Sequence, residues 1–292
     1  MRFSYAESFC DPHYLIPLAK AVEGAGYDSF VVPDSLIYPA ESDTSYPYTD
    51  SGDREFLEDK PIIEALTLCA VLGAVTETLN FTTFVLKLPV RPPVLVAKQA
   101  ASIAYLTNNR LKLGVGVSPW PEDFTALGQP WEKRGARMDD AIAIVQGLTA
   151  GGFFEHDGKV FSIDKMKICP TPTEPVPILI GGHSAPALRR AATVGDGWMH
   201  AGGDGDELVG YIDKLHDLRA KAGRSDLPFE IHVISMDAFS VDGVKRLEDM
   251  GVTDVIVGFR DPYTNDIDTQ SLEDKIGMLE RFAHDVVRKV NA

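Results

Sequence analysis

The sequence has little cysteine and none of the histidine or cysteine spacings that build metal sites. Its three cysteines, Cys10, Cys69 and Cys169, lie far apart with no CxxC pair, so neither a disulfide framework nor a zinc site is expected. The 7 histidines show no HxxxH or HExxH spacing, which argues against the usual histidine-based metal sites. We therefore expect a protein that binds no metal.

Long apolar runs and an excess of positive charge are also absent. No stretch approaches the roughly 18 apolar residues that a membrane span needs, and the first residues, MRFSYAESF, lack the pattern of a signal peptide. The formal net charge of -15 opposes binding to nucleic-acid backbones and anionic membranes. We expect a cytoplasmic protein that acts on a small-molecule substrate and binds neither nucleic acid nor membrane.

Two common nucleotide-binding motifs are missing as well. Neither GxGxxG nor GxxxxGK followed by Ser or Thr occurs, so a Rossmann dinucleotide site and a P-loop are both disfavoured. The composition is otherwise that of a globular protein, 45% hydrophobic and 24% charged. A phosphate group, if one is bound, must be held by another device.

Short runs rich in β-branched and aromatic residues alternate about eight times with longer runs of helical periodicity. Several of the short runs are continuously apolar, as expected of parallel strands buried on both faces. Eight βα units in 292 residues predict a (β/α)8 TIM barrel that forms one domain over residues 1–292. The expected strands are 2–6, 29–33, 80–86, 111–117, 177–181, 196–201, 229–235 and 253–259.

Two segments interrupt this alternation. Residues 35–60, after the second strand, are rich in Ser, Asp, Pro and Tyr. Because loops that follow strands build the active face of a barrel, we expect this segment to enclose the substrate; a solvated surface loop is the alternative. Residues 152–176, before the fifth strand, predict a small hairpin that turns at Asp157-Gly158.

Polar and aromatic residues follow the strands that should open onto the active face. Asp34 and Ser35 follow the second strand, where a carboxylate can orient a cofactor ring or move a proton, or simply cap a turn. After the fourth strand, Gly116 lets a flat ring approach the backbone, Trp120 supplies an aromatic wall and Glu122 is a candidate acid.

The stretch PILIGGHSAPALRR resembles an anion site, because an apolar strand runs into two glycines just before a helix starts. Ser184 is a good N-cap, and the helix that it begins directs free N–H groups toward Gly181, Gly182 and His183. An ordinary βα turn is the alternative. Together with Trp198 after the sixth strand, this turn predicts a face that accepts a planar cofactor with a phosphate.

Four stretches carry a specific family resemblance over about residues 15 to 200. The chain resembles the luciferase-like flavin or deazaflavin oxidoreductases of the bacterial luciferase superfamily. The resemblance implies a (β/α)8 barrel with insertions, usually dimeric, that holds either FMN or coenzyme F420, the 5-deazaflavin, at the carboxyl ends of its strands. The matching stretches are AVEGAGYDSFVVPDS, RPPVLVAKQAASIAYLTNNRLKLGVGVSPWPEDFTALG, RGARMDDAIAIVQGL and PILIGGHSAPALRRAATVGDGWMH.

The same resemblance implies cofactor contacts at specific positions. The segment at Phe84 and Val85, next to Thr83, corresponds to a bulge behind the ring that often contains a non-proline cis peptide in deazaflavin members. The turn after the fifth strand would bind the phosphate. The implied cofactor-binding residues are Thr83, Phe84, Val85, Gly116, Val117, Ser118, Gly181, Gly182, His183, Ser184 and Trp198.

Two departures from the resembled deazaflavin dehydrogenases concern the reaction. Where those enzymes carry a histidine and a glutamate, this chain has Ser35 and Pro119. Oxidation of an alcohol needs such a base, so we expect a reductase that passes hydride from the coenzyme to a small organic substrate. Asp34, Ser35 and Glu122 are the candidate catalytic residues. The candidate substrate walls are Tyr46, Tyr48 and Trp120.

Two other functions remain open on the sequence. One is an FMN-dependent luciferase-like monooxygenase that uses reduced flavin and O2, because a helix N-terminus binds the phosphate of either coenzyme. The other is a barrel that binds flavin without catalysis. The resemblance favours the deazaflavin enzyme and a homodimer.

Overall fold

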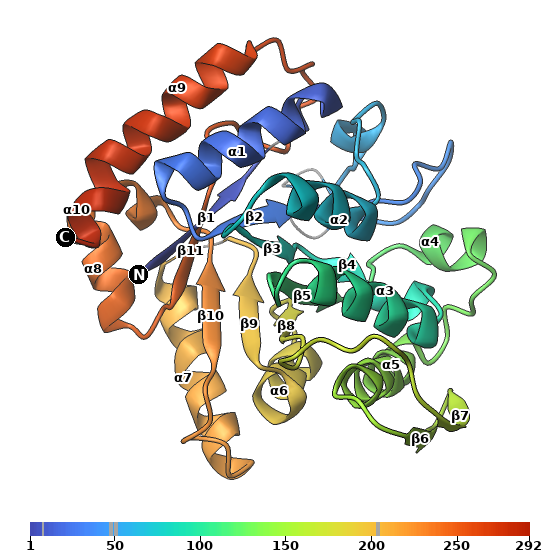
Figure 1. Cartoon of the computed structure of the whole chain (residues 1–292). Coiled ribbons are helices and arrows are strands. Elements are labelled where there is room, and N and C mark those ends of the chain that lie inside the picture. The colour runs from blue at the N-terminus through green and yellow to red at the C-terminus, as the bar shows by residue number, and fades with distance from the viewer. Residues whose placement is uncertain (8, 47–48, 50–51, 203–204) are drawn as a thin grey trace.

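The computed structural model describes residues 1–292 except 8, 47–48, 50–51 and 203–204. Among the described residues, eight parallel strands close a barrel, and β1 pairs with β11 to complete the ring (Figure 1). The predicted (β/α)8 barrel is therefore confirmed. The strands, in order around the ring, are β1 (Arg2–Ala6), β2 (Ser29–Val32), β3 (Asn80–Thr83), β5 (Leu111–Gly116), β8 (Ile178–Gly181), β9 (Gly197–His200), β10 (Glu230–Val233) and β11 (Asp254–Val257).

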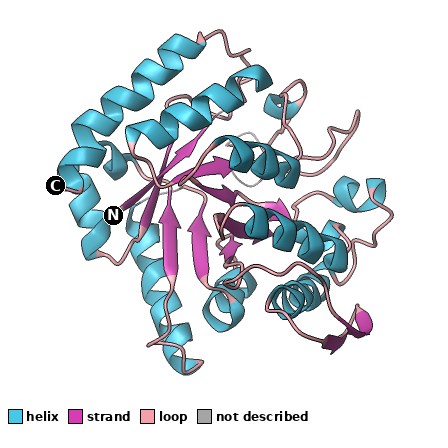
Figure 2. Ribbon diagram, viewed as in Figure 1, coloured by secondary structure: helices cyan, strands magenta, loops and turns pink. Residues whose placement is uncertain are grey.

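Helices surround the barrel on its outer face (Figure 2). No helix in the described part of the chain has both the length and the apolar character to cross a bilayer. The helices are α1 (Leu15–Ala25), α2 (Ala65–Val75), α3 (Pro93–Leu106), α4 (Pro121–Ala126), α5 (Arg134–Thr149), α6 (Ala185–Val194), α7 (Gly205–Lys221), α8 (Val241–Asp249), α9 (Leu272–Phe282) and α10 (Arg288–Val290).

The third strand is shorter than predicted. The expected strand over 80–86 ends at Thr83, and a two-residue strand, β4 (Leu86–Lys87), follows and pairs with the end of β5. The peptide bond between Phe84 and Val85 is cis, as the resemblance implied. This bulge moves the chain out of the ladder at the carboxyl end of the barrel.

The predicted hairpin is present as β6 (Phe154–Asp157) and β7 (Ser162–Met166). Its connection is held by Asp140 of α5, whose Oδ2 accepts from the backbone N–H groups of Val160 at 2.6 Å and Phe161 at 3.0 Å. The hairpin is thus attached to α5 on the outside of the barrel, away from the strand ends that matter for function.

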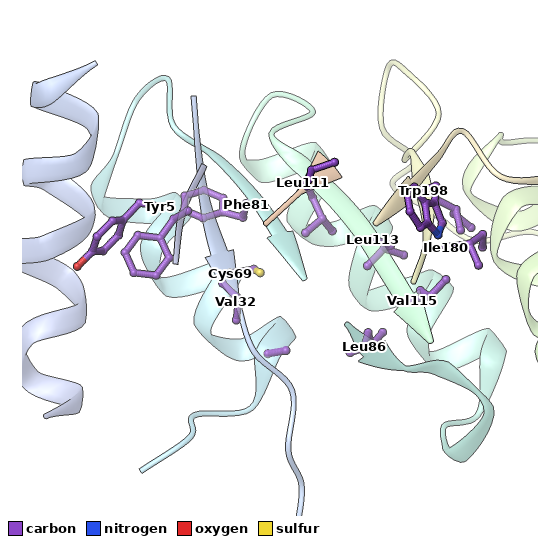
Figure 3. Packing of buried hydrophobic residues seen from close by; sticks show 14 of the residues in the cluster. Tyr5, Val32, Cys69, Phe81, Leu86, Leu111, Leu113, Val115, Ile180 and Trp198 are labelled. Carbon is purple, nitrogen blue, oxygen red and sulfur yellow. The ribbon is translucent and has the colours of Figure 1, made fainter. Parts of the chain in front are cut away.

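The main core lies between the strands and the helices. Phe81 of β3, Leu113 and Val115 of β5 and Trp198 of β9 point outward into this layer and are fully buried (Figure 3). Burying a side chain of this size contributes roughly 1.5–3 kcal/mol. The helices are therefore held on the barrel mainly by apolar packing.

The interior of the barrel is layered from charged to apolar. At the amino ends of the strands, Arg2 forms a two-point ion pair with Asp254, and Lys112 Nζ lies 2.7 Å from both carboxylate oxygens of Glu230. Glu230 and Asp254 also approach His232 closely enough to form a potential metal-ligand set. Because Arg2 and Lys112 already balance the two carboxylates, this cluster is built as an ion-pair network that closes the barrel.

The opposite end of the interior is apolar. Val31, Leu179, Met199 and Ile256 form a separate buried cluster, against which Phe84 and Val85 pack. This cluster closes the barrel interior near the carboxyl ends of the strands. The space between the cluster and the loops that follow the strands is therefore accessible only from the side of these loops.

Candidate active site

A cavity of about 300 Å³ opens at the carboxyl ends of the strands. Val31 and Met199 of the inner apolar cluster contribute to its floor. Loops after most of the barrel strands contribute the rest, and most of the lining is apolar or aromatic. This is the end at which barrel enzymes carry their active sites.

Gly116 and Gly181 contribute no side chain to one wall of the cavity and lie against Val85, and we call this surface the flat wall. A Cβ atom on Gly116 would come within 2.6 Å of Val85 Cγ2, and one on Gly181 within 2.8 Å of Val85 Cγ1. Only glycine fits at both positions. Of the predicted cofactor-binding residues, the ones that line the cavity are Phe84, Val85, Gly116, Val117, Ser118, Gly181 and Gly182.

Asp34 lines the cavity, and both of its carboxylate oxygens accept hydrogen bonds. Its Oδ1 accepts from Arg91 Nη2 at 2.8 Å, and its Oδ2 accepts from Arg91 Nη1 at 2.9 Å and from the Lys87 backbone N–H at 2.8 Å. The carboxylate is fully buried in this pairing. In this structure Asp34 fixes the chain that follows the bulge. Ser35, beside it, also lines the cavity, and the catalytic roles of both residues stay predictions.

Glu122 lies outside the cavity lining, and its role as a catalytic acid stays a prediction. Its Oε1 is 3.5 Å from Arg54 Nη2, and its pKa is lowered because hydrogen bonds, including one to Ser42, and the charge of Arg54 outweigh the opposing effect of burial. Glu122 therefore attaches the long loop after β2 to α4.

Thr83 does not reach the cavity either. Its Oγ1 donates to the carbonyl oxygen of Gly114 at 2.7 Å, and the side chain is fully buried. The predicted cofactor contact is thus replaced by a link between β3 and β5. The link fixes the end of β3 where the bulge begins.

The turn after β8 has the geometry of an N-capped helix start. Gly182 has a φ of 109°, a conformation that favours glycine. Ser184 is the N-cap of α6, and its Oγ accepts from the Ala187 N–H at 3.4 Å. The remaining N–H groups of the first turn lie at the positive end of the helix dipole, which suits an anion.

His183 lies in an aromatic stack beside the cavity, and its Nε2 accepts from the backbone N–H of the lining residue Ala201 at 3.3 Å. Its ring lies 4.7 Å from that of His200 and 4.9 Å from that of Tyr211. Burial lowers the pKa of His183, and burial with the neighbouring His183 lowers the pKa of His200 to about 4. Both imidazoles are therefore neutral at pH 7. The contact of His183 with the cofactor phosphate stays a prediction.

Trp198 faces the helix layer, not the cavity, which corrects its prediction as a cofactor contact. Successive residues of a strand point to opposite faces, and in β9 it is Met199 that points into the barrel. The indole Nε1 of Trp198 donates to the carbonyl oxygen of Gly182 at 2.9 Å. Trp198 therefore supports the turn after β8 from behind.

Aromatic side chains from three loops cover part of the cavity and form an aromatic roof. The ring of Tyr46 lies 5.5 Å from Phe56, 5.4 Å from Trp120 and 6.1 Å from Tyr263, and all four side chains line the cavity. Two of the three predicted substrate walls, Tyr46 and Trp120, therefore line the cavity, whereas Tyr48 lies outside the described residues. The long loop after β2 covers the cavity, as expected for an enclosing segment.

Two cations flank Trp120. The guanidinium carbon of Arg54 lies 4.8 Å from the indole centroid, and Lys87 Nζ lies 4.6 Å from it. Lys87 also forms a buried ion pair with Asp123, 2.8 Å from Nζ to Oδ2, and Ser118 Oγ donates to the same carboxylate. We did not predict Lys87 as a site residue, although a lysine directly after an apolar strand was a signal.

Glu7 at the end of β1 is a second lining residue that sequence reasoning missed. Its Oε1 accepts from Lys275 Nζ at 2.8 Å, and Lys275 also lies 2.6 Å from Asp268. The hydroxyl of Tyr5 donates to Glu7, and burial together with the Glu7 carboxylate raises the pKa of Tyr5. Glu7 is thus held in position by an ion pair with Lys275 of α9.

The fold and the site define the class: a (β/α)8 barrel whose apolar, flat-walled ligand cavity opens at the carboxyl ends of its strands. Residues 3–242 match the family model described as luciferase-like monooxygenase. The chain belongs to this family and is an oxidoreductase.

Two relatives show the range of the family around this chain. The uncharacterized protein Rv0940c of Mycobacterium tuberculosis is 60% identical over 290 residues, which cover 99% of this chain and 100% of the relative. The F420-dependent glucose-6-phosphate dehydrogenase of Beutenbergia cavernae is 30% identical over 249 residues, which cover 83% of this chain and 69% of the relative.

Solved structures share the fold at low identity. Monooxygenase RslO1 from Streptomyces bottropensis superposes with a TM-score of 0.75 at 14% identity, and the coenzyme F420-dependent tetrahydromethanopterin reductase from Methanopyrus kandleri with 0.73 at 13%. Each match covers 99% of both chains. At these identities the likeness shows the fold alone.

Proposed function

We propose that the protein is a coenzyme F420-dependent oxidoreductase that reduces a small organic substrate. The observation that carries the proposal is the flat wall, in which Val85 packs between Gly116 and Gly181 next to the N-capped turn of α6. The relative that is 30% identical and one structural neighbour are named as F420-dependent enzymes, which supports the deazaflavin over FMN.

The described residues fit a planar ring with a phosphate-bearing tail. The ring would lie against Val85, whose methyl groups fill the space that side chains at Gly116 and Gly181 would take. The phosphate would be held by Gly181, Gly182 and the first N–H groups of α6, without a lysine. When bound, the reduced coenzyme supplies a hydride at ring carbon C5.

The remaining site residues orient the substrate and exclude water. Tyr46, Trp120 and Tyr263 cover the space above the wall, and a closed, dry cavity protects a hydride donor from side reactions. The two carboxylates in the described lining, Glu7 and Asp34, are each held by a buried cation. Neither is poised to take a proton from an alcohol, which favours reduction.

A parallel titration of the cofactor-free protein with coenzyme F420 and with FMN tests the proposal. We expect saturable binding of F420, followed by its fluorescence, and no saturation by FMN at equal concentrations. Gly181→Ala, which places a Cβ against Val85, should weaken F420 binding. Saturation by FMN alone would make the protein a monooxygenase candidate, and tight binding without turnover of any acceptor would indicate a non-catalytic barrel.

A further inference from the structure

The charged residues of the cavity lining are all neutralised by buried partners. In the described part of the chain the lining contains three charged residues, Glu7, Asp34 and Lys87. Each pairs at 2.8 Å with an opposite charge from outside the lining: Lys275, Arg91 and Asp123, respectively. All six side chains are at least nine-tenths buried.

This balance leaves no countercharge for an anionic substrate. A charge moved into a buried site without a partner costs several kcal/mol. The seven residues outside the described part are Ser, Pro, Tyr, Asp, Ser, Gly and Asp, so they add no cation. The aromatic roof and the flat wall favour a planar body.

Lys87 is the one cation among the described lining residues, and a single carboxylate neutralises it. Among the described residues, Asp123 is the only carboxylate within ion-pair distance of Lys87 Nζ. Asp123 itself lies outside the lining, in the first turn of α4. Its charge thus cancels a positive charge that otherwise faces the substrate.

We propose that the cavity selects an uncharged, flat organic substrate and that Asp123 sets this selection by neutralising Lys87. This inference rests on the proposed function, because that function supplies the reduction reaction. It adds the class of substrate that is reduced. Asp123 acts through Lys87 as a positioning residue. A phosphorylated or carboxylated substrate is excluded because every cation that it would meet is already paired.

A matched pair of ligands tests this selection in the cofactor-free protein. We would titrate with 2-acetylnaphthalene and with 2-naphthoate, which share the ring system and differ by a methyl group in place of a carboxylate oxygen. The titrations use a phosphate buffer, because phosphate competes with 2-naphthoate for the anion site at the N-terminus of α6. The wild-type protein should bind the ketone at least about tenfold more tightly than the naphthoate, because the naphthoate is buried without a countercharge.

The informative variant is Asp123→Asn. It keeps the shape and leaves Lys87 unpaired, so the affinity for 2-naphthoate should rise at least about tenfold while that for the ketone changes less than about twofold. Asp285→Asn is the matched control: it makes the same chemical change at an exposed carboxylate, and its partners His284 and Lys289 do not line the cavity. Asp285→Asn should leave both affinities unchanged.

A second variant keeps the test decisive if Asp123→Asn does not fold. Ser35→Lys adds a cation to the lining and should also raise naphthoate affinity. Equal binding of both ligands by the wild type, or an unchanged ratio in folded Asp123→Asn and Ser35→Lys, would overturn the inference. Because these titrations need no coenzyme, their outcome is independent of whether F420 binds.

Discussion

The carboxylate of Asp34 and the guanidinium of Arg91 face each other in a two-point ion pair, with both oxygen–nitrogen distances below 3 Å. Asp34 follows β2, and Arg91 lies just after β4, so the pair ties the two sides of the bulge together. It holds in place the chain that carries Phe84, Val85 and Lys87.

Asp34→Asn should destabilise the fold because it removes the two-point partner of the buried Arg91 and leaves only the partly exposed Glu64, 3.7 Å away, as a countercharge. Breaking a buried pair from one side costs roughly 3 kcal/mol, and a shift of the urea midpoint measures it. Arg246→Ala provides the control, since its pair with Asp237 is exposed and contributes at most about 1 kcal/mol. Equal effects of the two substitutions would refute the structural role of Asp34.

Gly181→Ala should weaken coenzyme binding by about tenfold, since overpacking at Val85 costs roughly 1–3 kcal/mol. Fluorescence titration of the coenzyme measures the change. Gly210→Ala in α7 is the matched control, because a Cβ at Gly210 meets nothing within 4 Å and removes only the helix penalty of glycine. If both alanine variants bind equally, the flat wall is not part of the cofactor site.

The buried His200 should make the protein less stable in mild acid. Its folded pKa is about 4 against an ordinary value of 6.5, so the unfolded chain binds the proton more readily between these values. Stability is therefore full above about pH 6.5 and is lost as the pH falls toward 4. From this group alone, the free energy of unfolding should be about 2 kcal/mol lower at pH 5 than at pH 7.

His200→Asn tests the assignment, because an amide oxygen can still accept from the Gly202 N–H. The variant should lose that part of the pH dependence in denaturant titrations at pH 5 and 7. His284→Gln, at an exposed histidine, serves as the control and should keep the wild-type difference. A wild-type pH dependence in His200→Asn would contradict the prediction.

Arg54→Met should loosen the loop that covers the cavity. The side chain packs on Trp120 and pairs with Glu122. The Leu57 and Glu58 amides close the turn at Glu55–Leu57. Their hydrogen exchange should become at least about tenfold faster when Arg54 is replaced. Arg134→Met removes a similar contact with Trp131 away from the cavity and should leave these amides unchanged. If the Leu57 and Glu58 amides exchange at similar rates in both variants, Arg54 does not hold this loop in place.

The barrel was predictable from sequence because its pattern is repeated and local. Each strand is a short apolar run, and each helix carries one apolar face, so eight repetitions of the pair identify the fold. The break between β3 and β4 was not visible in the residues themselves, since Phe84 and Val85 are ordinary strand residues. Only the family resemblance indicated the bulge.

The sequence predicted which residues follow the strands near the site, but it did not predict which way their side chains point. Trp198 and Met199 are both buried, so a strand that is apolar on both faces gives no alternation to show which one points into the barrel. Asp34 and Glu122 were assigned from their places after strands. Their partners Arg91 and Arg54 come from distant parts of the chain, and such pairing is set by the tertiary fold.

The aromatic roof is assembled from Tyr46, Phe56, Trp120 and Tyr263, which come from three separate connections outside the barrel strands. Mutational libraries confined to these connections can reshape the roof while the barrel keeps its own packing. Gene duplicates of this chain therefore have a route to new substrates in which the roof diverges first and the coenzyme wall is inherited unchanged.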